Sequence, residues 1–182
     1  MRGALLFAAV VALASCDSDG AIDTISDTSL DPAIWRADGQ KVSGALPRVV
    51  ASFKPSEGAD AFATSYRTGP VFGGSCAYAD GARQLVVRVE SGNIRERAAA
   101  LAKGRANPGE SFITRDATVH GKHATVHWNG IGKTADVVFV LQRRLLVQLV
   151  LVPAKGEDEA VQLAESMDVG PLEALVFDGV TK

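Results

Sequence analysis

Four short runs of strand-like sequence follow one another between residues 111 and 152, and they constrain the fold more than any other feature. Polar or glycine-containing links separate the runs, which cover residues 111–120, 123–128, 133–141 and 144–152. Links this short most economically join neighbouring antiparallel strands. The last run is apolar at almost every position, which predicts a central strand covered on both faces. We therefore expect an antiparallel meander in the C-terminal half of the domain.

Residues 75–89 predict a β-hairpin ahead of this meander. Asp80-Gly81 separates two runs of alternating hydrophobicity, and Asp-Gly at such a position is a strong signal for a two-residue turn. With this turn, Cys76 faces Leu85 on the neighbouring strand. Cys76 is then expected on the apolar face of the hairpin.

Two helices are expected. The first follows Asn93, a capping residue with Glu96 three positions later, and it ends before Gly104. The second carries acidic residues at 157–159 in its first turn. Apolar side chains line one face of each helix, and we expect both helices to cover the same side of the sheet. The fold class is therefore α+β, a twisted antiparallel sheet of six or seven strands packed by two helices.

All three histidines lie within eight residues, at positions 120, 123 and 127. If Gly121-Lys122 forms a hairpin turn, His120 faces His123 with Cβ atoms about 5 Å apart. His127 then lies roughly 13 Å from His123 along the strand and cannot join the same site. Two histidines fall short of the three or four ligands typical of zinc sites. The pattern favours a solvated polar face, and a metal site that recruits an outside carboxylate is the alternative.

Cys76 is the other candidate for chemistry. A redox or nucleophilic thiol needs an exposed, electropositive setting, whereas the expected neighbours of Cys76 are apolar. This favours a buried structural cysteine, and the sequence assigns no catalytic, cofactor-binding or metal-binding residue. We therefore expect a protein that is not an enzyme. The alternative is an envelope enzyme or metal-handling protein that uses His120, His123 and Cys76.

The first fifteen residues predict an export signal. Arg2 supplies a positive charge, and residues 4–14 form an apolar run too short to span a bilayer. Leu13-Ala14-Ser15-Cys16 follows at once, and this order resembles the lipobox of bacterial lipoproteins. The resemblance implies cleavage before Cys16, attachment of lipid, palmitate-type acyl chains included, to its sulfur and new amino group, and a mature protein held at a membrane. An ordinary secretory signal peptide is the alternative.

Asp17 bears on the choice of membrane. An aspartate directly after the lipidated cysteine resembles the signal that keeps lipoproteins of enteric bacteria in the inner membrane. This favours the periplasmic side of the inner membrane, and the outer membrane stays open.

The remaining chain divides into three parts. We expect residues 16–46 to form the lipidated cysteine and a flexible acidic tether. Residues 47–176 are expected to form a single α+β domain, and residues 177–182 a C-terminal tail. The formal net charge of the chain is only −2, and no basic stripe with interleaved aromatic residues is present, which argues against nucleic acid as a partner. With lipid on Cys16, Cys76 has no partner for a disulfide within the chain.

Several pieces in this order resemble a group of uncharacterised bacterial envelope lipoproteins. They are the lipobox, the hairpin, the first helix, and residues 119–126, 144–147 and 167–175. The order of strands and helices is also similar to the sheet-and-helix domains of the PsbP and Mog1-like group. Neither resemblance supplies an active site or a cofactor. We therefore expect a membrane-anchored envelope lipoprotein that acts as a non-enzymatic binding or accessory module for another protein.

Overall fold

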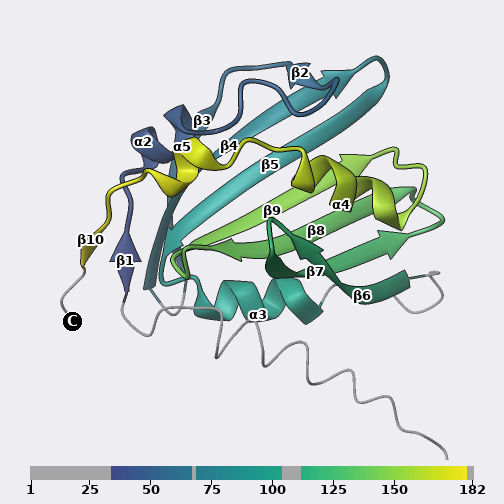
Figure 1. The fold of residues 1–182 in the computed structure, drawn as a ribbon. Helices are drawn as coiled ribbons and strands as arrows, with labels where there is room; N and C mark the ends of the chain where they lie inside the picture. Colours follow the sequence, from purple (N-terminus) through teal and green to yellow (C-terminus); the bar gives the residue numbers. More distant parts are fainter. Residues whose placement is uncertain (1–33, 67–68, 104–111, 180–182) are drawn as a thin grey trace, which may run out of the picture.

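The computed structural model describes residues 34–66, 69–103 and 112–179. These residues form one open antiparallel sheet with helices on both of its faces (Figure 1). The expected α+β class with an antiparallel sheet is confirmed. Within the described ranges, no helix has the length and apolar character needed to cross a membrane. Cys16, the expected site of lipidation, lies outside the described residues.

The described part of the sheet has ten strands, rather than the six or seven expected. The seven longer strands run side by side in the order β3-β4-β5-β9-β8-β7-β6. Their bounds are Asp60–Tyr66 (β3), Gly69–Asp80 (β4), Arg83–Gly92 (β5), Phe112–Val119 (β6), Lys122–Asn129 (β7), Thr134–Leu141 (β8) and Leu145–Val152 (β9). The remaining strands have two residues each, and they are Trp35–Arg36 (β1), Lys54–Pro55 (β2) and Asp178–Gly179 (β10). Strands this short show no alternating pattern, so the sequence could not reveal them.

Strands β6 to β9 form the expected meander, and β9 joins it to the β4–β5 hairpin. Leu149 of β9 pairs with Val87 of β5 on one side and with Val137 of β8 on the other. This central position explains why β9 is apolar along nearly its whole length. Alternate β9 side chains point to opposite faces of the sheet, and both faces are covered.

The helices are α2 (Gly39–Gly44), α3 (Arg95–Lys103), α4 (Glu157–Glu165) and α5 (Gly170–Glu173). A large core contains buried residues of α2, α4 and α5 together with the odd-numbered residues of β9, which are Leu145, Val147, Leu149 and Leu151. Leu146 belongs to a smaller core that includes Ala98 of α3. The expectation that both predicted helices pack on one side is therefore wrong. Figure 1 shows α3 on the opposite side of the sheet from α4.

The turn of the β4–β5 hairpin differs from the predicted one by one residue. Asp80 pairs with Arg83, so the two turn residues are Gly81 and Ala82. Gly81 has a φ of +62°, and glycine at the first turn position suits a type II′ turn. Cys76 consequently pairs with Val87 instead of Leu85. A shift of two residues leaves every side chain on its predicted face, because the period of a strand is two.

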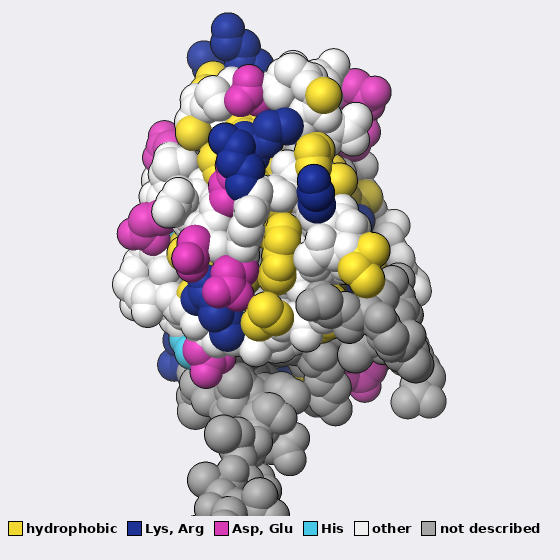
Figure 2. Space-filling view, turned by 90° about the vertical axis from the view of Figure 1, so that its right-hand side faces the viewer, with side chains coloured by type: hydrophobic (Ala, Val, Ile, Leu, Met, Phe, Trp, Pro, Cys, Tyr) yellow, Lys and Arg dark blue, Asp and Glu magenta, His cyan; other side chains and the backbone are white. Residues whose placement is uncertain are grey.

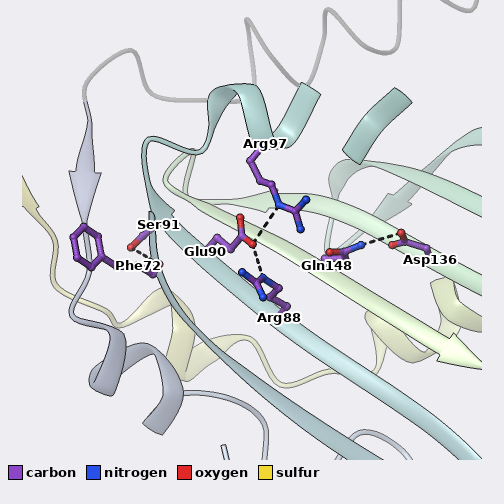
Figure 3. Close-up of polar contacts among 7 residues, drawn as sticks. All are labelled: Phe72, Arg88, Glu90, Ser91, Arg97, Asp136 and Gln148. Carbon is purple, nitrogen blue, oxygen red and sulfur yellow. Dashed lines mark hydrogen bonds and ion pairs between the residues drawn. The ribbon is translucent and has the colours of Figure 1, made fainter. Parts of the chain in front are cut away.

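The described domain extends beyond both expected boundaries. Trp35, assigned to the tether by the sequence, pairs with Gly92 of β5 and with Gly179 of β10 in the expected tail. Helix α2, also within the expected tether, packs so closely on β4 that a Cβ on Gly74 would lie 2.6 Å from the Cα of Ser43. The backbone N–H of Ala37 donates to Ser91 Oγ, whose hydroxyl donates to the carbonyl of Phe72 (Figure 3). Residues 35–46 are thus part of the folded unit.

Candidate functional site

The structure separates the two histidines that the sequence placed face to face. The turn between β6 and β7 is His120-Gly121, with φ values of +50° and +67°, and both signs suit a type I′ turn. His120 therefore lies in the turn itself, and His123 pairs with Thr118. The predicted turn at Gly121-Lys122 and the predicted pairing of His120 with His123 are wrong. Asn, Asp and His tolerate positive φ better than most residues, which explains this choice of turn.

His120 and His123 contact different parts of the domain. The Nε2–H of His120 donates to the carbonyl of Ala164 on α4 at 2.9 Å, and its backbone N–H donates to Oε2 of Glu165 at 2.6 Å. His123, on the α3 side of the sheet, donates from Nε2 to Oδ1 of Asp116 at 3.1 Å. Within the described ranges, no group of three or more His, Cys, Asp or Glu side chains is arranged to hold a metal ion.

His127 is buried beneath α3. Only 4% of the residue is exposed, and its Nε2–H donates to the carbonyl of Leu101 on α3 at 2.6 Å. Its Nδ1 lies 3.1 Å from Oγ1 of Thr114, and the ring stacks on Phe112. The polar face of this hairpin, expected in solvent, is therefore covered in part by α3. Both ring nitrogens of His127 thus have partners within the domain, and the hydrogen bond to Leu101 ties α3 to the sheet.

Cys76 of β4 is buried in the large core, on the face of the sheet opposite α3. The residue is 5% exposed, and its Sγ lies 3.6 and 3.8 Å from the backbone carbonyl oxygens of Ala77 and Glu57. Burial raises the pKa of the thiol, the negative charge of Asp60 adds to this, and a hydrogen bond with Tyr78 opposes it. A raised pKa keeps the thiol protonated and unreactive. The three residues of the alternative hypothesis, His120, His123 and Cys76, thus do not converge.

A row of charged and polar side chains lies between α3 and the sheet (Figure 3), and no sequence pattern predicted it. Its centre is Glu90 of β5, whose side chain is only 2% exposed. Oε1 of Glu90 accepts from Nε of Arg88 at 2.5 Å and from Nε of Arg97, on α3, at 3.4 Å. The guanidinium of Arg88 also lies 3.9 Å from the centre of the Phe62 ring. Two cations thus compensate the charge of one buried carboxylate.

Asp136 of β8 continues the row across the sheet. Its Oδ2 accepts from Nε2 of Gln148 at 3.0 Å, while its buried Oδ1 has no hydrogen-bond partner among the described residues. Burial raises the pKa of this carboxyl, and the opposing influences are the Gln148 hydrogen bond and the charges of His127 and Arg97. His127 lies directly opposite Asp136 on β7 but makes its hydrogen bonds elsewhere. The charged row therefore fastens α3 to the sheet and does not assemble a catalytic dyad.

A second candidate site is a shallow pocket at the end of the sheet where β5 and β8 begin and β9 ends. The pocket has a volume of about 310 Å³, and we call it the end pocket. Its lining residues are Arg83, Trp128, Gly130, Lys133, Pro153, Ala154 and Lys155. Figure 2 views the molecule from this end, where Lys and Arg side chains gather beside hydrophobic ones.

The three cations of the end pocket differ in how they are held. Arg83 donates to Glu159 Oε1 at 2.5 Å and to the carbonyl of Pro153 at 3.3 Å, so its charge is largely neutralised. Lys133 and Lys155 are exposed, and neither side chain has an ion-pair partner among the described residues. Within the described part of the chain, the end pocket therefore presents two positive charges without an acidic partner.

Comparison of the chain with protein-family models, with curated proteins and with solved structures gives no match.

Proposed function

We propose that this protein is an envelope lipoprotein, anchored in a membrane by lipid on Cys16, whose domain is a non-enzymatic binding or accessory module for another protein. The lipobox-like Leu13-Ala14-Ser15-Cys16 supports the anchor, and Asp17 favours the periplasmic side of the inner membrane. The first arm of the test is metabolic labelling with an alkyne-bearing fatty acid. Labelling of the wild-type chain and its loss in Cys16→Ala are expected, because the sulfur is the attachment atom.

The observation that carries the binding role is that each candidate catalytic side chain is already engaged in a structural contact. His120 fastens a turn to α4, His123 pairs with a carboxylate of β6, and Cys76 lies in the core. By contrast, Lys133 and Lys155 of the end pocket are exposed and unpaired within the described residues. A surface with unpaired charge and no neighbouring nucleophile or base suits recognition better than catalysis.

The position of the end pocket suits an anchored module. The chain from Cys16 enters the described domain at β1, at the left of Figure 1, whereas the strand ends that line the pocket are at the right. The pocket thus lies at the end of the sheet opposite the strand with which the described domain begins.

The second arm of the test is photo-crosslinking in living cells. A photoreactive aromatic amino acid replaces Ile131, an exposed side chain beside the pocket, so that both lysines are kept, and the matched control carries it at Lys54, an exposed lysine of β2. The proposal expects one reproducible protein adduct at position 131 that is absent at position 54. Adducts of equal yield at both positions, or a small-molecule turnover that co-purifies with the protein and is lost in His120→Asn, would contradict the binding role.

A further inference from the structure

We propose that the end pocket binds an acidic segment of a partner protein, with the carboxylates held by Lys133 and Lys155 and an apolar side chain packed beside Trp128. This inference rests on the proposed function and names the chemistry of its partner.

The charge of the end pocket favours an acidic ligand. Glu159 pairs with Arg83, and the other acidic residues in the first turn of α4, Glu157 and Asp158, pair with Arg115 of β6 instead. Among the residues that the structure describes, the ammonium groups of Lys133 and Lys155 are thus left without an acidic partner. Two carboxylates two positions apart on an extended chain would compensate both ammonium groups at once.

Hydrogen bonds hold the backbone of the pocket wall in place before a ligand binds. Oδ1 of Asn129 accepts the N–H groups of Ile131 and Gly132 at 3.0 and 2.9 Å, which fixes the β7–β8 turn. The N–H of Ala154 donates to the carbonyl of Lys133 at 2.6 Å and joins the two walls. The N–H of Lys155 donates to Oε2 of Glu159 at 2.7 Å. Because the backbone that carries both lysines is already fixed, less entropy is lost when a ligand binds.

The apolar surface beside the cations favours a polypeptide over a simple anion. Ile131, at the tip of the β7–β8 turn, is 70% exposed, and Val152, next to Pro153 of the pocket, is 39% exposed. Trp128 lies in the pocket wall and is only partly buried. A free phosphate has nothing to pack on these side chains, whereas an extended peptide that carries acidic and apolar residues at every second position presents both kinds on one face and matches both features.

The test uses the full chain purified in detergent and a fluorescein-labelled peptide of ten residues, Ser-Glu-Ser-Glu-Ser-Leu-Ser-Glu-Ser-Glu, whose glutamates and leucine share one face when the peptide is extended. Binding is followed by fluorescence anisotropy at low salt. The test variant is Lys133→Gln/Lys155→Gln, and the matched control is Lys54→Gln/Lys122→Gln, which removes the same charge from exposed strand positions elsewhere. A third variant, Ile131→Ser, tests the apolar contact at a side chain too exposed to matter for folding.

The proposal expects the test variant to bind the peptide at least about fivefold more weakly than the wild type, and the control to stay within about twofold. A peptide with glutamine in place of glutamate should bind poorly, and Ile131→Ser should weaken binding of the glutamate peptide. Amide NMR signals of residues 130–133 and 154–155 should shift on titration.

Equal binding of the peptide by the test and control variants would overturn the proposal. So would binding to vesicles containing phosphatidylglycerol, or to tripolyphosphate, that exceeds peptide binding and depends on Lys133 and Lys155. These results are separable from failure of the proposed function. Loss of peptide binding leaves Cys16 labelling unchanged, and an unlabelled Cys16 leaves the peptide result standing.

Discussion

Arg97 on α3 and Glu90 on β5 form an ion pair across the boundary between helix and sheet, with Nε and Oε1 3.4 Å apart. Glu90 is almost completely buried and also accepts from Arg88 of its own strand. The pair therefore holds α3 on the face of the sheet opposite α4 (Figure 3). The small core beneath α3 has few large side chains, so we expect this polar contact to contribute noticeably to docking of the helix.

Arg97→Met should loosen α3 without unfolding the sheet. The variant keeps an apolar stem but removes one of the two cations beside Glu90, and a loss of about 1–2 kcal/mol is expected. Hydrogen exchange should accelerate in residues 95–101 and stay nearly unchanged in β9. The control is Glu96→Gln on the exposed side of the same helix. If exchange in α3 is equally fast in wild type and Arg97→Met, the ion pair does not hold the helix.

Asp136→Asn should change how stability depends on pH. Burial raises the pKa of Asp136 in the folded state, so the folded protein binds this proton more tightly than the unfolded chain does. Its contribution to stability is then present at low pH and is lost as pH rises from the ordinary value of 3.8 through the raised folded value. Urea unfolding at a series of pH values should show Asp136→Asn gaining stability relative to wild type across that window. A constant difference between the two proteins would contradict the assignment.

Cys76 should resist thiol reagents in the folded protein and react quickly in denaturant, because its Sγ is buried and its pKa is raised. Cys76→Ser should cost about 1–3 kcal/mol, since it places a hydroxyl among apolar side chains. Cys76→Ala, which adds no polar group, is the comparison. Rapid labelling of the native protein would revive the redox hypothesis.

The two histidines should respond differently to substitution. His120→Asn keeps a residue that tolerates positive φ but shortens the side chain that reaches Ala164, and we expect a loss of about 1 kcal/mol. His123→Ala should be nearly neutral, because its partner Asp116 is exposed. Zinc titration by calorimetry should give only weak binding to the wild type. Submicromolar, stoichiometric binding that is lost in the double variant would make metal handling the leading hypothesis.

The hairpins show what alternation in the sequence can predict and what it cannot. It correctly placed Cys76 on the apolar face of its hairpin and Val126 on the apolar face of the next one. It gave the wrong pairing in both hairpins. Moving a two-residue turn by one position shifts the pairing by two residues, which leaves every side chain on the same face. The choice between those turns depends on the φ values of His120 and Gly81, which alternation does not record.

The charged row and the end pocket depend on long-range pairing. Arg88 and Gln148 are neighbours only because β5 pairs with β9, and Arg97 reaches Glu90 only because α3 crosses the sheet on the face away from α4. Each of these side chains, taken alone, reads as an ordinary exposed polar residue. The apolar character of residues 145–152 did predict that both faces of β9 are covered, but not which helix covers which face.

The most direct test of the lipid-anchored module is the intact mass of the mature protein extracted from membranes. If the protein is a lipoprotein, the mature chain begins at Cys16 and carries a diacylglyceryl group on the sulfur and an acyl chain on the amino group. A chain that begins at Cys16 or elsewhere with a free Cys16 thiol, or one that keeps residues 1–15, would contradict it.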